Sequence, residues 1–173
     1  MKIVGIDLAG KKTNPTTICF LVEEKIEFKN VFSDKEILDI SKSINPDIIA
    51  IDAPIIRGVP KIRKADSLLK KYKAFPPTLP GMKCLTIRGS RLASQLLSHF
   101  KVIEVFPTAT AKILNKYSKN FQETAANFNI LVETKHELDA YLCCLTGKMY
   151  LEGNTVQIGD DEGKIIVPKL LIF

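Results

Sequence analysis

Short apolar runs separated by polar links fill the first part of the chain. Residues 2–8, 16–23 and 26–32 are rich in β-branched and aromatic side chains and predict three strands. Only Glu24 and Lys25 separate the second run from the third, which indicates a hairpin. Because the links are short, we expect these strands to form an antiparallel meander.

A helical pattern follows the meander, and a nearly continuous apolar run comes after it. Ser33 and Glu36 have the spacing of a capping box, and the apolar positions behind them predict a helix over 34–44. Residues 47–52 (DIIAID) suit a strand buried on both faces. Since a helix precedes this strand, a crossover and a parallel pairing are expected.

The rest of the chain alternates between helical, loop and strand patterns. Prolines and glycines predict loops over 53–61 and 74–87, on either side of a basic helical stretch at 62–72. A fifth strand is expected at 101–106, and two short β-like pieces lie in the tail, at 155–158 and 164–167. The remaining helices are expected over 89–99, 108–118, 121–128 and 134–151. This order predicts an α/β fold with a mixed five-stranded sheet, a three-strand antiparallel meander plus parallel strands, flanked by helices.

Length and composition limit the class of protein. A chain of 173 residues with 46% apolar and 25% charged residues suits one folded domain over 1–173 and excludes disorder. The four cysteines form no C-x-x-C pair, which argues against a zinc ribbon. No signal-peptide pattern is present, and no apolar run approaches the roughly 20 residues that span a membrane. We therefore expect a cytoplasmic protein with reduced cysteines and no membrane partner.

The positive charge of the chain is concentrated in one segment. The net charge is +6, but residues 57–91 hold ten Lys or Arg and one acid, for a net +9. The rest of the chain, with 15 bases and 18 acids, carries −3. This segment is expected to be a basic insertion, either a solvated surface or a binding region for an anionic partner.

Three acids stand in or at the ends of apolar strands. Asp7 ends the first strand, Asp52 ends the fourth, and Glu104 interrupts the fifth. A lone buried carboxylate costs several kcal/mol unless it is paired or bound to a metal, and one such case is easily a cap or a salt bridge. Three cases together indicate a site, because sites form at the carboxyl ends of parallel strands.

The chemistry of these acids points to a hard divalent cation. If the strands of Asp7 and Asp52 are parallel neighbours, the two carboxylates can share one ion, and Mg²⁺ or Mn²⁺ suits such oxygen ligands. Clustered carboxylates with open positions are typical of two-metal phosphoryl transfer. Asp139, at the edge of the buried face of the last helix, is a further ligand candidate, with His136 on the same side. Glu137 is about 200° away from Asp139 and is expected to be solvated.

The chain resembles the ribonuclease H-like superfamily, and within it the DUF429 family of nucleases assigned from their fold. The residues that carry the resemblance are GIDLAG (5–10), IDAPI (51–55), RKAD (63–66), EVFPTAT (104–110), HELDAYLCCLTG (136–147) and GDDEGKIIVPK (159–169). The resemblance implies a metal-dependent nuclease with Asp7, Asp52 and Asp139 as its metal-binding acidic site. Glu104 would be a fourth catalytic acid or a neighbour of the site.

Residues for binding nucleic acid, DNA or RNA, are expected in and after the basic segment that follows Asp52. Asp66 lies three residues after Arg63 and can orient it as a fork for phosphate, the alternative being an ordinary intrahelical ion pair. Tyr72 and Phe75 are candidates for stacking on bases, with packing as the alternative. The full set of expected substrate-binding residues is Arg57, Arg63, Lys64, Arg88 and Arg91.

Two other functions are compatible with these features. The chain could keep the fold and the basic segment and bind nucleic acid without cleaving it. An ATPase or a sugar-kinase-like protein is the third reading, but such proteins need two domains with a phosphate loop in each, and 173 residues leave room for one. The exposed edge strand of a meander permits a homodimer without requiring one.

Overall fold

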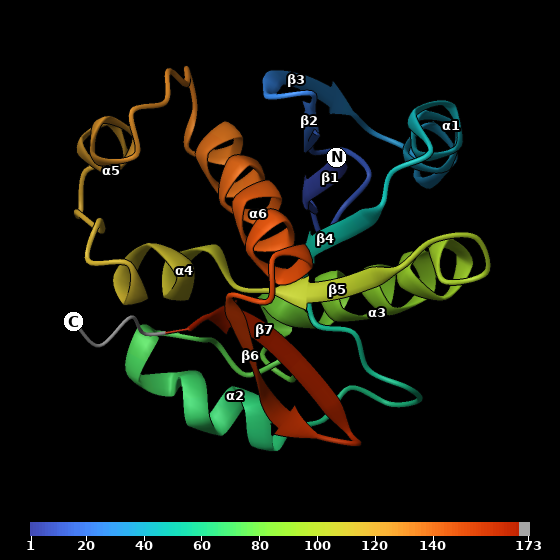
Figure 1. Ribbon diagram of the computed structural model, residues 1–173. Helices are drawn as coiled ribbons and strands as arrows, with labels where there is room; N and C mark the ends of the chain where they lie inside the picture. Colours follow the sequence, from blue (N-terminus) through green and yellow to red (C-terminus); the bar gives the residue numbers. More distant parts are fainter. Residues whose placement is uncertain (170–173) are drawn as a thin grey trace.

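The computed structural model describes residues 1–169, and these form a seven-stranded mixed sheet with helices on both faces (Figure 1). The order across the sheet is β3-β2-β1-β4-β5-β7-β6. The strands are β1 (Lys2–Asp7), β2 (Thr16–Val22), β3 (Lys25–Val31), β4 (Ile48–Asp52), β5 (Val102–Val105), β6 (Thr155–Asp160) and β7 (Gly163–Pro168). The helices are α1 (Asp34–Ile44), α2 (Lys64–Leu69), the 3₁₀ turn η1 (Lys70–Tyr72), α3 (Pro80–Leu96), α4 (Pro107–Ile113), α5 (Phe121–Asn127) and α6 (Lys135–Leu151). The last four residues of the domain expected over 1–173 lie outside the described residues.

The predicted meander and crossover are both present. β1 pairs antiparallel with β2, and β2 with β3. Glu23 and Glu24, both with positive φ, make the tight turn of the hairpin, which suits the twist of the strands. The capping box of Ser33 and Glu36 opens α1. That helix leads into β4, which pairs in parallel with β1.

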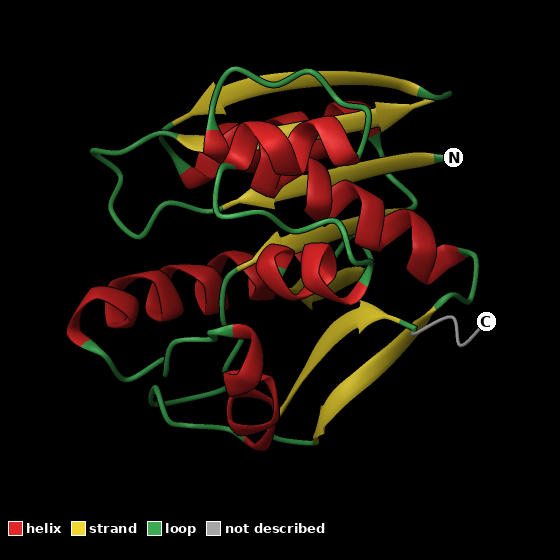
Figure 2. Ribbon diagram, turned by 90° about the vertical axis from the view of Figure 1, so that its left-hand side faces the viewer, coloured by secondary structure: helices red, strands yellow, loops and turns green. Residues whose placement is uncertain are grey.

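The expected five-stranded sheet is wrong by two strands. The β-like pieces of the tail form a hairpin, and β7 pairs in parallel with β5 while β6 takes the edge. The acid-rich GDDEG stretch (159–163) makes the hairpin turn, with Gly159 at a φ of 121°. Figure 2 shows how strongly this hairpin is turned away from the N-terminal meander. Both strands are short, so their own sequence does not decide whether they join the sheet. The hairpin joins it because β7 pairs with β5, about 60 residues earlier in the chain.

The expected loop over 74–87 is also partly wrong. α3 begins at Pro80 and runs through to Leu96 without a break. Pro80 occupies the first turn, where a missing N–H costs nothing and the fixed φ already suits a helix. The proline therefore starts the helix, whereas its position among other prolines and a glycine had favoured a loop. The basic helix expected at 62–72 is divided into α2 and η1.

The alternation of side chains divides the sheet into two buried faces. Val4 and Ile6 of β1 pack with α1 and α3, together with the matching positions of β4. Ile3 faces the other way, toward α6. Gly5 lets α6 approach closely, because a Cβ there would lie 2.3 Å from the carbonyl oxygen of Ala140. This close packing sets the distance between the end of β1 and the first turns of α6.

No helix within residues 1–169 has the length and apolar character needed to cross a membrane.

Candidate active site

Asp7 and Asp52 end neighbouring parallel strands and lie directly opposite each other in the register. Asp7 follows Ile3 and Gly5 at intervals of two, so its side chain stands on the face covered by α6. Asp52 follows Ile48 and Ala50 in the same way. The two carboxylates therefore project from one face at the carboxyl end of the parallel strands, as expected for a site in such a sheet.

Asp139 reaches this pair from the opposite element, α6. A capping box of Thr134 and Glu137 starts the helix, which places Asp139 in its second turn. The side chain of Asp139 is mostly buried, and its charge acts on both Asp7 and Asp52. The structure thus brings together the three acids proposed as metal ligands. Glu137, expected to be solvated, accepts hydrogen bonds from the backbone at the helix start.

Burial raises the pKa of all three acids, and repulsion by a neighbouring acid adds to the rise at Asp7 and Asp52. Burial, and then repulsion by Asp7 and Asp139, raises the pKa of Asp52 well above its ordinary value. The pKa of Asp7 is raised by burial and by Asp139, against the effect of a hydrogen bond with His136. Burial also raises the pKa of Asp139, although Lys135 opposes this rise. The cluster holds more negative charge than its protein surroundings neutralise.

Two of the three carboxylates have partners from the first turn of α6. Nδ1 of His136 lies 2.6 Å from Oδ2 of Asp7, which agrees with the expected supporting position of this histidine. Lys135 forms an ion pair with Asp139, four residues later. Burial lowers the pKa of Lys135, but the charges of Asp139, Asp7 and Asp52 outweigh that effect and raise it. Sequence reasoning missed Lys135, although its i,i+4 spacing from Asp139 was a usable signal.

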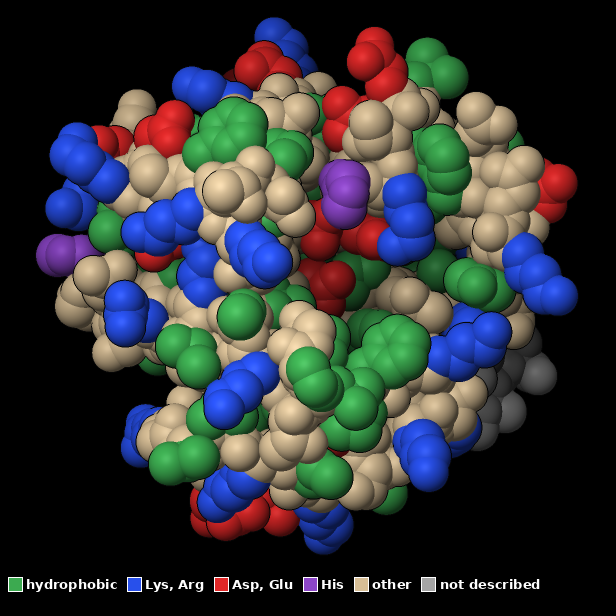
Figure 3. Space-filling model, turned by 180° about the vertical axis from the view of Figure 1, so that it is seen from behind, with side chains coloured by type: hydrophobic (Ala, Val, Ile, Leu, Met, Phe, Trp, Pro, Cys, Tyr) green, Lys and Arg blue, Asp and Glu red, His purple; other side chains and the backbone are tan. Residues whose placement is uncertain are grey.

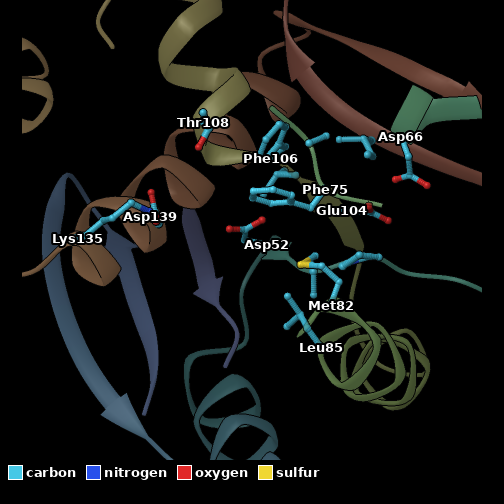
Figure 4. A pocket seen from close by; sticks show the side chains of 15 residues that line it. Asp52, Asp66, Phe75, Met82, Leu85, Glu104, Phe106, Thr108, Lys135 and Asp139 are labelled. Atoms are coloured by element: carbon cyan, nitrogen blue, oxygen red, sulfur yellow. Dashed lines mark hydrogen bonds and ion pairs between the residues drawn. The ribbon is translucent and has the colours of Figure 1, made fainter. Parts of the chain in front are cut away.

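Asp52 lines a hollow beside the cluster and makes no ion pair or hydrogen bond with another side chain in residues 1–169. The space-filling view shows acidic side chains at the bottom of this hollow, bordered by a histidine, basic and apolar side chains (Figure 3). Lys135 and Asp139 form part of the wall (Figure 4). A half-buried carboxyl group with no side-chain partner in residues 1–169 thus borders the hollow at the candidate site.

The donor set fits a hard divalent cation by its chemistry, because it consists of carboxylate oxygens that repel one another. Within the described part of the chain, however, no three Asp, Glu, His or Cys side chains are arranged closely enough around one point to hold a metal ion. Two of the three carboxylates already have a side-chain partner, Asp7 in His136 and Asp139 in Lys135. The acids are neighbours, but their oxygens do not yet converge.

Glu104 does not join the three aspartates. It lies opposite Ile51 in the register of β4 and β5, so it shares the face of Ile51, and Asp52 projects from the other face. Its oxygens accept two hydrogen bonds of 2.6 Å from the Arg63 guanidinium and one of 2.7 Å from the backbone N–H of Ile55. Glu104 also lines the hollow at Asp52, and its charge contributes to the raised pKa of Asp52, so its position fits the alternative of a neighbour of the site. Its role as a fourth catalytic acid stays a prediction. The strand register, which cannot be read from the sequence of one strand, decides this position.

Arg63 is turned inward, so its expected role as a phosphate fork does not fit either. Its side chain is fully buried between Asp66 and Glu104, and it forms an ion pair with each. The expected contact with Asp66 is present, but that contact belongs to a buried network. The guanidinium has no free edge for a phosphate.

Arg88 is the second internal arginine among the expected substrate-binding residues. Its guanidinium donates to Asp34 Oδ1 at 2.8 Å and to the backbone oxygens of Ala9 and Phe32. It holds the loop after β1 and the start of α1 to α3. Arg88 therefore has a structural role, because moving its guanidinium to a phosphate would leave those acceptors unpaired and cost free energy.

The other expected substrate-binding residues are exposed. Arg57 and Arg91 line a surface hollow together with Ser90, and none of the residues that line it also lines the hollow at Asp52. Lys64 is exposed at the start of α2. Arg57, Lys64 and Arg91 are therefore accessible to an anionic partner, whereas Arg63 and Arg88 are buried.

Residues from the basic segment nevertheless help to build the site. Phe75, Met82 and Leu85 line the same hollow as Asp52 and Asp139, and so does Phe106 from the start of α4 (Figure 4). Sequence reasoning considered Phe75 for base stacking but missed the other three. The signal for Met82 and Leu85 was hidden because the start of α3 had been interpreted as loop.

Comparisons with known proteins agree with the architecture. No protein-family profile matches the chain, and no curated protein sequence matches it. Among solved structures, the chain is similar to RuvC of T. thermophilus in complex with a Holliday junction substrate, with a TM-score of 0.54 and 14% identity. The match covers 88% of this chain and 96% of that one. The mixed sheet with flanking helices has the ribonuclease H-like fold.

Proposed function

We propose that the chain is a metal-dependent nuclease that hydrolyses phosphodiester bonds of nucleic acid. The observation that carries this proposal is the grouping of Asp7, Asp52 and Asp139 at the carboxyl ends of parallel strands, beside a hollow that Asp52 and Asp139 line. Buried carboxylates that raise one another's pKa are costly to the fold and are typical of functional sites. The ribonuclease H-like architecture supports the same class of reaction, as an analogy of fold.

The three aspartates would hold Mg²⁺ or Mn²⁺, hard cations that suit carboxylate oxygens. A bound ion would supply Lewis-acid stabilisation of charge on a phosphate. Asp52, which has no side-chain partner in residues 1–169, is the carboxylate most open to an incoming group. Lys135 and His136 stand beside the aspartates, where their N–H groups are available to orient phosphate oxygens.

Nucleic acid is the proposed substrate class. The exposed cations Arg57, Lys64 and Arg91 support it, since they can neutralise phosphates without reading sequence. RuvC, the similar solved structure, is bound to a Holliday junction. The motifs that resemble the DUF429 family support membership of that family as part of the proposal. The four free cysteines support action in the reducing cytoplasm.

Cleavage of labelled oligonucleotides in Mg²⁺ or Mn²⁺ tests this function. The wild-type chain should cut at least one of four substrates: single-stranded DNA, duplex DNA, a branched DNA and single-stranded RNA. Asp7→Asn should abolish cutting, because it removes a ligand charge at the centre of the cluster. Asp161→Asn, on the exposed turn of the β6–β7 hairpin, is the matched control and should cut normally. Cutting by Asp7→Asn at the wild-type rate would contradict the proposal.

A second candidate is a nucleic-acid-binding protein that does not cleave. One observation favours it: the oxygens of the aspartates do not converge, and Lys135 and His136 already partner two of them. Such a protein would bind the same oligonucleotides equally well in EDTA and in Mg²⁺. It would release no product with any metal.

A further inference from the structure

The hollow at Asp52 has two chemically different walls. Asp52, Asp139 and Lys135 form a charged wall, apolar groups form the other, and Asp66 and Glu104, both paired with Arg63, also line the hollow. The apolar groups come from the loop after β4, from the segment before α3, from α3 and from the end of β5: Pro54, Phe75, Met82, Leu85 and Phe106. In Figure 4, Phe75 and Phe106 stand on one side of Asp52, and Met82 and Leu85 on another. A ligand in this hollow would place a charged part and an apolar part side by side.

Phe75 is the unusual member of the apolar wall. Its side chain is 66% exposed, although it borders a cavity, whereas Tyr72, three residues earlier, packs against a buried cluster. Lys73 adjoins it in sequence and has a left-handed backbone conformation, φ 71°, which turns the chain between η1 and this segment. An aromatic ring with a free face beside a carboxylate site is available for stacking.

The size of the hollow limits what could enter it. Its volume is about 230 Å³, below the roughly 300–1,000 Å³ typical of pockets for drug-sized ligands. One flat ring system suits this space better than a larger group. Thr108 adds a hydroxyl to the lining, and such a group can hydrogen-bond to a ring edge.

We infer that the hollow receives one unstacked nucleobase of the strand whose phosphate lies at the aspartates. This inference rests on the proposed action on nucleic acid and names the form of the substrate. The base would stack on Phe75 and lie against Met82 and Leu85, while its own backbone stays at the charged wall. A base inside a regular duplex cannot turn into a pocket without losing its stacking and pairing. The site therefore favours single-stranded or distorted nucleic acid.

Binding measurements in EDTA, where no metal supports cleavage, test the pocket separately from the reaction. The probes are fluorescent 12-mers: oligo(dT), oligo(U), and a DNA backbone of the same length with abasic residues throughout. The wild-type chain should bind at least one base-bearing probe roughly 5- to 150-fold more tightly than the abasic one, which is the range for one stacked base. The two base-bearing probes show whether DNA or RNA is the preferred source of the base.

Phe75→Ala should remove this preference and leave the affinity for the abasic probe unchanged. Phe75→Tyr, which keeps a stacking ring, should retain the preference. The matched control is Leu97→Ala, which shortens an exposed apolar side chain near the far end of α3, about 22 Å along the helix from Met82. Because Phe75 is exposed, neither of its variants should alter the melting temperature.

Each result has a definite meaning. Equal binding of abasic and base-bearing probes by the wild type would contradict the inference that the hollow receives a base. Failure to bind any probe would contradict it as well. A preference that survives Phe75→Ala would overturn the role of that ring. A base preference lost in Phe75→Ala, in a chain that cuts nothing in Mg²⁺ or Mn²⁺, would support the pocket and reject the nuclease. Cutting of a substrate without any base preference in binding would support the nuclease and reject the base pocket.

Discussion

The carboxylate of Asp52 is the clearest residue in this chain at which function and stability oppose each other. It is half-buried beside two other acids, and burial followed by the charges of Asp7 and Asp139 raises its pKa well above the ordinary value of 3.8. A raised pKa in an acid means that the folded state favours the protonated form. The contribution of Asp52 to stability is therefore most favourable below the unfolded-state pKa, and it is lost as the pH rises from there through the raised pKa.

We accordingly predict that Asp52→Asn stabilises the metal-free protein. Removing a strained buried charge typically adds about 0.5–2 kcal/mol, or roughly 1–8 °C in melting temperature for a chain of this size. The gain should be small near pH 4, where the wild-type acid holds a proton, and larger at pH 7. Thermal melts in EDTA across this range provide the measurement. A variant less stable than wild type at pH 7 would show that Asp52 is not under electrostatic strain.

Among the elements, one buried ion network joins four parts of the chain. Arg63, at the start of α2, binds Glu104 of β5 and also lies against the turn of the β6–β7 hairpin, where a Cβ on Gly163 would come within 2.6 Å of its Cδ. Glu104 also accepts the N–H of Ile55, three residues after Asp52. The network thus fixes the loop that leaves the candidate site, which makes Glu104 a positioning residue.

Breaking this network from one side should be costly. Glu104→Ala leaves the buried guanidinium of Arg63 with one carboxylate partner, Asp66, and we expect a loss of about 3–5 kcal/mol in the free energy of unfolding. Glu104→Gln keeps acceptor and donor atoms of similar shape and should lose less. The exposed pair of Lys35 and Asp39 supplies the control, since solvent screens such a pair and Asp39→Ala should cost far less. Equal urea midpoints for Glu104→Ala and Asp39→Ala would contradict this role.

Across the whole molecule, the charge is divided between an interior and a surface population. The segment 57–91 has a net charge of +9, yet Arg63 and Arg88 neutralise acids inside the fold. The other eight cations of the segment are exposed. Part of the segment also lines the hollow at Asp52. The buried arginines of the segment therefore serve the stability of the fold, and its apolar residues, rather than its cations, line the hollow at the candidate site.

The negative cluster should make the stability of the whole chain depend on divalent metal. Mg²⁺ at about 100 times its dissociation constant would add roughly 2.7 kcal/mol, a rise of about 5–11 °C in melting temperature. Asp7→Asn should lose most of this rise, while Asp161→Asn should keep it. Differential scanning calorimetry with and without Mg²⁺ gives the comparison. An equal rise in both variants would place the metal effect outside the cluster.

The sequence by itself determined much of the local structure. The capping box of Ser33 and Glu36, the hairpin after Val22 and the buried strand before Asp52 all follow from patterns within a few residues. The acids at the strand ends were recognisable for the same reason, since charge at the end of an apolar run is a local feature. Asp139 was found as well, from its position at the edge of the apolar stripe of α6.

Only the tertiary structure decided which of these residues meet. The register of β4 and β5 put Glu104 on the face opposite Asp52, and folding brought Arg63 and Arg88 into the interior. The β6–β7 hairpin joined the sheet through pairing with a distant strand, which no local pattern reveals. Strand register and ion pairs between remote segments depend on packing across the whole fold, so the sequence could supply the candidate acids and cations but not their partners.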